Sequence, residues 1–415
     1  MISTGQALRL LDGPPLAGRA ETLDAHLARL GALPAGRATR DTIPALEASG
    51  LLGRGGAGFP VGRKWRALAE RPSGPAVVVA NGAEGEPASA KDRVLMAHRP
   101  HLVLDGAQIA AEAIGADEIV VYVGGEHRAA VAAMHRAIDE RRGQPQPPIR
   151  LVEAPESYIA GEATAAVHYL NAQDARPTTT PPRMSQRGVR GLPTLVQNVE
   201  SLAWAALIAR YGERWYRSAG RNGAEGTALV TLSGAVARGG VHEIELGTTV
   251  GELAEAAGGS RAGSRAVLLG GYFGTWARPD DAWSLPLDAE PMRAHGLTFG
   301  CGLVGILPDG ICGVAATARI MGYLARESAG QCGPCVYGLG SLGEATARLA
   351  RGEARDRELD DVERWTAQLP DRGACRHPDG AAQLMASALD VFGDEFARHA
   401  RTGRCSVTGS GIAAA

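Results

Sequence analysis

The sequence predicts an α/β protein with three folded parts, and three observations lead to this fold class. Apolar strand-like runs alternate with helix-like segments between residues 50 and 220. A shorter β-β-α-β pattern follows, and from about residue 306 onward apolar residues recur at three- and four-residue spacing, as they do in helices. Because alternating strands and helices are typical of a largely parallel sheet, we expect a parallel α/β domain, a β-grasp domain and a helical domain.

The elements of the first domain are indicated one by one along the chain. Strands are expected at "AVVVAN" (76–81), "EIVVYVGG" (118–125) and "IRLVEA" (149–154), with helices at 101–115 and 127–142 between them. The expected boundaries are an N-terminal helical arm at 1–49, the α/β domain at 50–220, the β-grasp domain with a linker at 221–305, the helical domain at 306–405 and a flexible tail at 406–415.

Composition excludes several classes of protein. The net charge of −2 argues against a nucleic-acid or anionic membrane partner. The first residues lack a signal-peptide pattern, and no run approaches the roughly 18 apolar residues of a membrane span. We therefore expect a cytoplasmic protein without direct membrane insertion. Lysine occurs only at Lys64 and Lys91, so these positions either need a compact ammonium rather than a planar guanidinium or have kept lysine by chance.

The stretch "GLLGRGGAGFPVGRKW" (50–65) contains the glycine spacing of a dinucleotide-binding turn. That turn must follow a strand, whereas the residues before Gly50 have the pattern of a helix. The segment is thus either a glycine-rich surface turn or a loop whose bare backbone approaches a phosphate or a flat ring.

Polar residues follow the predicted strands. Carboxyl ends of parallel strands are where open α/β sheets bind ligands, although loop acids can also be simply solvated. Three short segments supply such side chains, and their candidate residues are Asn81, Glu84 and Glu86; Tyr158, Gly161 and Glu162; and Gln197 and Asn198.

Three of the six cysteines lie in two short motifs within the predicted helical region. Cys332 and Cys335 form a CxxC pair in "ESAGQCGPC", and Cys375 follows in "RGACRHPDG". Disulfides are rare in cytoplasmic proteins, so zinc, a redox dithiol and an iron-sulfur cluster are the alternatives. The other three, Cys301, Cys312 and Cys405, have no such pattern and are expected to be small buried hydrophobic residues.

Taken together, these segments resemble the NADH-binding flavoprotein (51 kDa-type) subunit family of respiratory complex I and of NAD-linked hydrogenases and formate dehydrogenases. The similarity extends over residues 40–400 and is most specific in "GRGGAGFPVGRKW". It implies a variant Rossmann-like FMN/NADH domain, an SLBB-like β-grasp domain and a C-terminal helical iron-sulfur domain. The implied activity is that of an NADH dehydrogenase, which passes electrons from a nicotinamide nucleotide through FMN to an iron-sulfur cluster.

The resemblance also implies site residues. FMN and the dinucleotide would lie against Gly55, Gly56, Gly58 and Lys64, with Phe59 stacked on adenine. The flavin and nicotinamide pocket would be lined by Asn81, Tyr158, Gly161, Glu162, Gln197 and Asn198, together with Glu84 and Glu86 as catalytic residues. Cys332, Cys335 and Cys375 would hold the metal of a 4Fe-4S or 3Fe-4S cluster.

The sequence departs from the family pattern at several positions. Ala329 stands where the family has another cluster cysteine, which leaves three thiolates and water or another side chain such as His377 to complete the site. Ala83 and Ala163 replace acidic residues, Gln197 replaces an asparagine, and Ala67 and Arg183 replace aromatic residues. Loss of a carboxylate and gain of Arg183 would lessen repulsion of a 2′-phosphate, so NADPH is an alternative to NADH.

Two other hypotheses are alternatives to the enzyme function. One is a redox-inactive paralogue that serves as a scaffold or binding module, and the other is a ferredoxin-linked flavoprotein with weak nicotinamide binding. In the leading interpretation a separate small iron-sulfur protein, either a ferredoxin or a thioredoxin-like 2Fe-2S subunit, is the expected partner.

Overall fold

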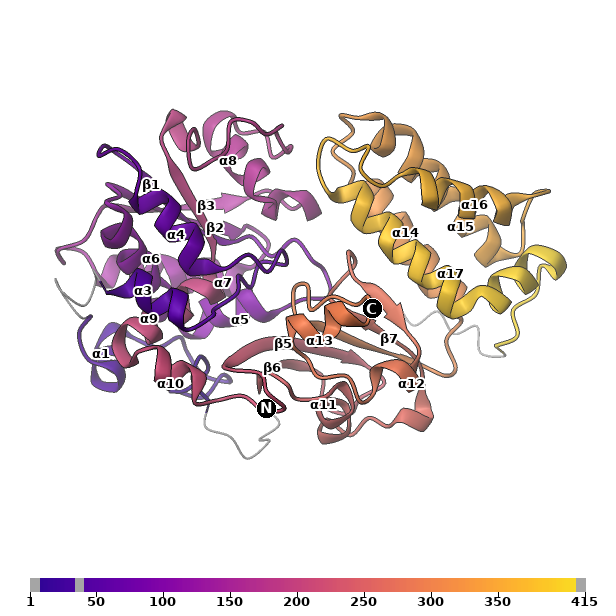
Figure 1. Ribbon diagram of the computed structural model, residues 1–415, viewed down its shortest axis with the longest axis horizontal. Helices are drawn as coiled ribbons and strands as arrows, with labels where there is room; N and C mark the ends of the chain where they lie inside the picture. The colour runs from indigo at the N-terminus through magenta and orange to yellow at the C-terminus, as the bar shows by residue number, and fades with distance from the viewer. Residues whose placement is uncertain (1–7, 34–40, 408–415) are drawn as a thin grey trace. The chain divides into compact units, whose positions relative to one another are not determined.

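The computed structural model describes residues 8–33 and 41–407. Two compact units make up the chain, one from residues 3–230 and 241–247 and the other chiefly from 231–240 and 248–415 (Figure 1). Within the described residues no helix is long and apolar enough to cross a bilayer. The domain boundaries expected from the sequence stay predictions.

The first unit is built around a parallel sheet with strand order β3-β2-β1-β4. All three strand pairs are parallel, and Val77 to Gly82 of β1 pair with Glu118 to Val123 of β2. Its elements up to residue 217 are α1 (Leu23–Leu30), α3 (Thr42–Ala48), α4 (Val61–Ala69), β1 (Val77–Gly82), α5 (Lys91–His98), α6 (Pro100–Ile114), β2 (Glu118–Gly124), α7 (Arg128–Glu140), β3 (Ile149–Ala154), η1 (Tyr158–Gly161), α8 (Ala163–Ala172), η2 (Val189–Gly191), β4 (Thr194–Asn198), α9 (Val199–Tyr211) and α10 (Glu213–Arg217).

Successive residues of β1 face opposite sides of this sheet, as the pleat requires. Val78 and Ala80 pack into a core shared with α6 and α9, whereas Val77 and Val79 pack into a second core with Ala166 of α8. Because both faces are covered, every position from Val77 to Ala80 is buried, which explains the continuous apolar run in the sequence. The three strands and two helices predicted here are confirmed, and β4 is a strand that the sequence pattern did not reveal.

A second, mixed sheet has the order β6-β5-β9-β7-β8. It contains the predicted β-β-α-β sequence of β5, β6, α11 and β7, and adds β8 and β9. β9 runs parallel to β5 and antiparallel to β7. The elements are β5 (Thr227–Gly234), β6 (Gly240–Glu245), α11 (Val250–Ala256), η3 (Arg261–Gly263), β7 (Ser264–Leu269), β8 (Thr275–Ala277), α12 (Pro279–Ala282), α13 (Ala289–Ala294) and β9 (Leu303–Pro308).

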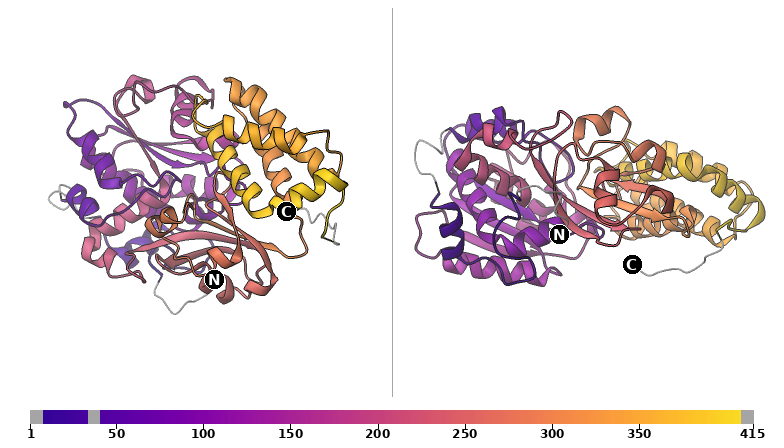
Figure 2. Two further views of the ribbon diagram at one scale, coloured as in Figure 1. Left: turned by 45° about the vertical axis from the view of Figure 1, so that its right-hand side comes forward. Right: turned by 90° about the horizontal axis from the view of Figure 1, so that it is seen from below.

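The remainder of the second unit is helical, as predicted. Figure 2 shows its orange and yellow helices lying side by side, in agreement with the contacts of α14 with α15 and α17 and of α16 with α17. These elements are α14 (Gly313–Arg326), η4 (Pro334–Leu339), α15 (Gly340–Arg351), α16 (Glu358–Gln368) and α17 (His377–Thr402). The parallel sheet, the mixed sheet and this helical region together confirm the predicted fold class.

Candidate functional site

The carboxyl ends of β1 and β4 lie next to each other in the parallel sheet. Asn81 at the end of β1 is in register with Asn198 at the end of β4. Two segments that are far apart in the sequence therefore present their polar residues at one edge, where open α/β sheets bind ligands.

The glycine-rich loop reaches this edge. Its ends are joined by a bridge between Leu52 and Pro60, and the Gly53 amide donates to the Phe59 carbonyl at 2.9 Å. The loop follows helix α3, as predicted, so it is not a standard Rossmann turn. A Cβ placed on Gly55 would lie 3.3 Å from Cβ of Asn198, which shows how closely the loop backbone approaches the end of β4.

Open space lies beside the next glycines of the loop. Gly56 and Gly58 have φ angles of +103° and +62°, and a Cβ on either would meet no atom within 4 Å. Only glycine adopts these conformations readily, and the missing side chains leave a cradle in which a flat ring or phosphate can contact the backbone. Phe59, 53% exposed at the end of this loop, presents an aromatic face for stacking.

Lys64, in the first turns of α4, points toward β4. Its ammonium donates a hydrogen bond to the Val196 carbonyl. Burial lowers the pKa of Lys64 to about 8, because the charged form has lost most of its hydration. An anion at this position would restore part of that lost stabilisation.

Two hydrogen bonds join the predicted residues of different segments. The Asn81 amide Nδ2 donates to the Gly161 carbonyl at 2.9 Å, and the Tyr158 hydroxyl donates to Oε2 of Glu86 at 3.2 Å. These contacts tie η1 to the end of β1 and to the loop that follows it. The structure thus brings four of the predicted residues together on one side of the sheet edge.

Glu84 and Glu162 act as helix caps in this structure. The Glu84 carboxylate accepts the backbone amides of Asp92 and Arg93, both at 2.9 Å, at the start of α5. Glu162 accepts the amides of Thr164 and Ala165 at the start of α8. Both carboxylates therefore position loops that carry other site residues.

Gln197 and Asn198 are adjacent in β4 but have different environments. Asn198 caps α9 with its Oδ1 and donates from Nδ2 to Asp92 at 2.7 Å. Gln197 is 4% exposed, and its buried Oε1 has no hydrogen-bond partner among the described residues. A buried carbonyl oxygen without a donor is costly, so this oxygen is available to accept a hydrogen bond from a bound molecule.

The three cysteines of the predicted cluster lie in the helical region of the second unit. Cys335 is buried in η4, and Cys332 and Cys375 are half-buried. Burial, with the nearby charges of Cys332 and Cys375, raises the pKa of the Cys335 thiol to about 11. Among the described residues, a different set, Cys312, His399 and Cys405, has three metal-binding atoms that all lie within 4.8 Å of one another.

Comparison with known proteins identifies the family. Residues 46–206 match the Nuo51 FMN-binding domain, and residues 315–399 match the iron-sulfur binding region of NADH-ubiquinone oxidoreductase-F. The NADH-quinone oxidoreductase F subunit numbered 2 of Rhizobium meliloti is 33% identical over 385 residues, which are 89% of this chain and 91% of that protein. This chain belongs to the family of NADH-quinone oxidoreductase flavoprotein subunits.

Further relatives support this assignment. The NADH-quinone oxidoreductase F subunit of Mycobacterium tuberculosis H37Rv is 34% identical over 381 residues, covering 88% of this chain and 86% of that protein. The crystal structure of an NAD+-reducing NiFe hydrogenase in the H2-reduced state matches with a TM-score of 0.81 and 27% identity, covering 93% of this chain and 68% of that chain.

Family membership confirms the resemblance inferred from the sequence motifs. The chain is an NADH dehydrogenase-type flavoprotein subunit, with FMN and a 4Fe-4S cluster as cofactors and NADH as substrate. The relatives themselves are named as subunits of NADH-quinone oxidoreductase. The residue-level assignments above stay predictions, and the loss of a cluster cysteine at Ala329 is likewise an inference from the sequence pattern.

A buried charge cluster beside the flavoprotein site was missed in the sequence. The Lys91 ammonium donates to Asp92 at 2.8 Å and to Glu200 at 2.9 Å, and all three side chains are buried. Burial by itself would lower the pKa of Lys91, but the two nearby carboxylates together have a larger effect and raise this pKa. Burial raises the pKa of Asp92 to about 7. The signal was the rarity of lysine, which marked Lys91 without revealing its partners.

The expectation for the remaining cysteines was wrong. Cys301 and Cys312 are half-buried and Cys405 is exposed, so they are not small hydrophobic residues of the core. Cys312 and Cys405 lie together with His399, a grouping that depends on helix packing and leaves no motif in the sequence. His377, the side chain suggested as a further cluster ligand, is buried, and its Nε2 lies 2.8 Å from the Leu324 carbonyl.

Proposed function

We propose that FMN binds over the glycine loop at the carboxyl ends of β1 and β4. The observation that supports this placement is the combination of open space beside Gly56 and Gly58 with the unpartnered Oε1 of Gln197. The edge of a flavin ring carries an N–H that such an oxygen would accept. When bound, FMN takes up two electrons as a hydride from the nicotinamide and releases them singly to a cluster.

Different residues of the chain would bind different parts of FMN and the dinucleotide. Lys64 and the loop amides favour the phosphate, because the desolvated ammonium gains from a nearby anion. Phe59 offers its exposed ring to adenine. Asn81, Gly161, Glu86 and Tyr158 form the hydrogen-bonded wall against which the nicotinamide and flavin are oriented. In this role Glu86 contacts the reactants, whereas Glu84 and Glu162 keep their capping bonds and position the wall.

Cys332, Cys335 and Cys375 are the proposed ligands of the cluster. Their soft sulfur donors fit an iron-sulfur cluster, and water or a side chain such as His377 completes the set in place of the cysteine absent at Ala329. We propose that the electrons leave to a separate small iron-sulfur protein, a ferredoxin or a thioredoxin-like 2Fe-2S subunit. The cytoplasmic location stays a prediction.

Anaerobic purification followed by assays of released flavin, iron and sulfide tests the whole assignment. We expect one FMN per chain. In Gln197→Leu, FMN affinity should fall roughly tenfold or more, since one hydrogen bond to a buried group contributes about 1.4 kcal/mol. Gln368→Leu, on an exposed residue of α16, is the matched control. FMN affinity unchanged in both Gln197→Leu and Lys64→Met would contradict the placement. A folded protein without FMN or iron would favour the scaffold alternative.

We further propose that the site tolerates NADPH. Arg183 is exposed and Ala83 lacks the carboxylate of the family pattern, so a 2′-phosphate meets less repulsion. Arg183→Glu is expected to lower the efficiency of flavin reduction by NADPH while that by NADH is retained, with Arg187→Glu as the control. Reduction by NADH at least about a hundred times more efficient than by NADPH, in the unmodified protein, contradicts this proposal.

A further inference from the structure

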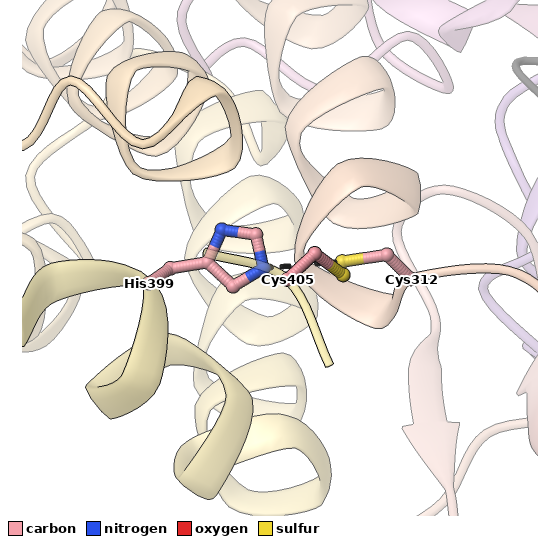
Figure 3. Close-up of side chains that lie close together, drawn as sticks. All are labelled: Cys312, His399 and Cys405. Carbon is pink, nitrogen blue, oxygen red and sulfur yellow. Dashed lines mark hydrogen bonds between the residues drawn. The ribbon is translucent and has the colours of Figure 1, made fainter. Parts of the chain in front are cut away.

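Three side chains from separate elements meet at one end of the helical region, away from the cluster cysteines in sequence. Cys312 precedes α14, His399 lies in the last turn of α17, and Cys405 follows α17. Figure 3 shows the two sulfurs and the imidazole ring facing one another, and their ligand atoms all lie within 4.8 Å of one another. None of these residues belongs to the cofactor sites described above.

Their spacing is that of ligands around a single metal ion. Sγ of Cys312 and Nε2 of His399 are 3.5 Å apart. In a tetrahedral zinc site, Zn–S bonds of about 2.3 Å and Zn–N bonds of about 2.0 to 2.1 Å place a sulfur and a nitrogen ligand about 3.6 Å apart. One ion between these atoms therefore requires little movement of Cys312 or His399.

The histidine is held in the tautomer that a metal ion needs. Nδ1 of His399 lies 2.9 Å from the Leu349 carbonyl of α15, an acceptor, so Nδ1 carries the proton. The lone pair is consequently on Nε2, the atom that faces the sulfurs. A backbone carbonyl bonded to the far nitrogen is the usual outer-shell support of a histidine ligand. His399 is 2% exposed, which further restricts its ring.

The surroundings act on the Cys312 thiol in opposite directions. Cys312 occupies the N-cap of α14, where the Ala315 amide points at its sulfur at 3.5 Å. Burial nevertheless raises the pKa of Cys312 to about 12, so without a metal ion this thiol stays protonated. Cationic side chains line the depression that contains Cys405, namely Arg398, Arg401 and Arg404.

We propose that Cys312, His399 and Cys405 form a second metal site, which binds one Zn²⁺ ion and ties the segment after α17 to the start of α14. Binding forms two Zn–S bonds and one Zn–N bond, and releases the thiol protons of both cysteines to solvent. Cys405 is exposed, so water completes the tetrahedron. The donor set of two soft sulfurs and one imidazole suits zinc, and its tight spacing separates it from the cluster cysteines.

Zinc content measured with iron and sulfide content in the same samples tests this site. The protein is purified anaerobically under reducing conditions, supplied with Zn²⁺ and freed of loosely bound metal. We expect one zinc per chain in the unmodified protein and at least tenfold weaker zinc binding in Cys405→Ser, with iron and sulfide unchanged. Cys405 is exposed and outside the core, so this variant is expected to fold. Cys301→Ser, at another half-buried cysteine outside the group, is the matched control.

Three results would overturn the proposal. They are zinc binding of equal strength in Cys405→Ser and the unmodified protein, no zinc bound by the reduced protein at micromolar free Zn²⁺, and a Cys312–Cys405 disulfide that persists under reducing purification. Thermal unfolding supplies an independent readout, since a ligand that binds only the folded state raises the melting temperature. Zinc is expected to raise it in the unmodified protein and in Cys301→Ser, and to leave it unchanged in Cys405→Ser.

Discussion

Replacing Lys91 with methionine is expected to destabilise the first unit strongly. The Lys91 ammonium lies 2.8 Å from a carboxylate oxygen of Asp92 and 2.9 Å from one of Glu200, and the side chains are 3%, 8% and 0% exposed, respectively. Methionine preserves the length and apolar contacts of the lysine stem but leaves two carboxylates without their shared cation. Removing one partner of a buried ion pair typically costs about 3 to 5 kcal/mol, because the remaining charge stays desolvated.

This cost is measurable as a change in melting temperature. For a folded unit of this size, roughly 2 to 4 °C are lost per kcal/mol, so Lys91→Met should lower the transition by about 6 to 20 °C. The assay is thermal unfolding followed by circular dichroism at pH 7. Arg214→Met is the matched control, because the Arg214 side chain is 97% exposed and its loss removes a positive charge without uncovering a buried acid.

A double variant tests the electrostatic reasoning itself. Glu200→Gln keeps an oxygen for the Leu229 amide, which Glu200 accepts at 2.9 Å, while it removes one negative charge. Lys91→Met combined with Glu200→Gln should therefore be more stable than Lys91→Met alone. Equal melting temperatures for Lys91→Met and the Arg214→Met control would refute the role of the buried cluster.

Three further predictions concern the same unit. Asp92 has a folded pKa of about 7, above its ordinary value of 3.8, so its stabilising contribution is present below pH 4 and is lost as the pH rises toward 7. The melting temperature of the unmodified protein minus that of Asp92→Asn should accordingly fall between pH 5 and pH 7, and a constant difference would contradict this. Gly106→Ala would place a Cβ 2.0 Å from the Leu202 carbonyl and should lower the free energy of unfolding in urea by several kcal/mol, whereas a loss below about 0.5 kcal/mol would show that α6 and α9 can separate freely. Glu162→Ala removes the cap of α8 and should cost about 1 kcal/mol in the same assay, with no loss if water replaces the cap.

The local sequence was sufficient for much of the fold. The apolar run at 76–81 predicted a strand, and Val77 to Ala80 are all buried because both faces of the sheet are covered. The glycine loop was distinguished from a Rossmann turn because a helix precedes it, and its positive φ angles at Gly56 and Gly58 agree with the presence of glycine there. The motifs also indicated the flavoprotein family, which the relatives confirm.

Packing between elements determined features that local sequence patterns do not predict. β4 is short, and it becomes a strand because Thr194 to Asn198 pair with β1, so its identity depends on a partner more than a hundred residues earlier. The catalytic role predicted for Glu84 stays a prediction, and only the structure shows that the turn after β1 directs its carboxylate to two backbone amides at the start of α5.

The amino-acid sequence alone was sufficient to predict the strongly periodic strands and helices, the residue types that bind cofactors, and the family. Which charges and ligands meet depends on how the elements pack in three dimensions. Lys91 joins Glu200 through the packing of α5 and α9, and Cys312, His399 and Cys405 meet where α14, α17 and the segment after α17 come together. The physical reason is that periodicity reflects burial within one element, whereas a buried ion pair or a metal site depends on distances between elements, which are set by how side chains pack across them.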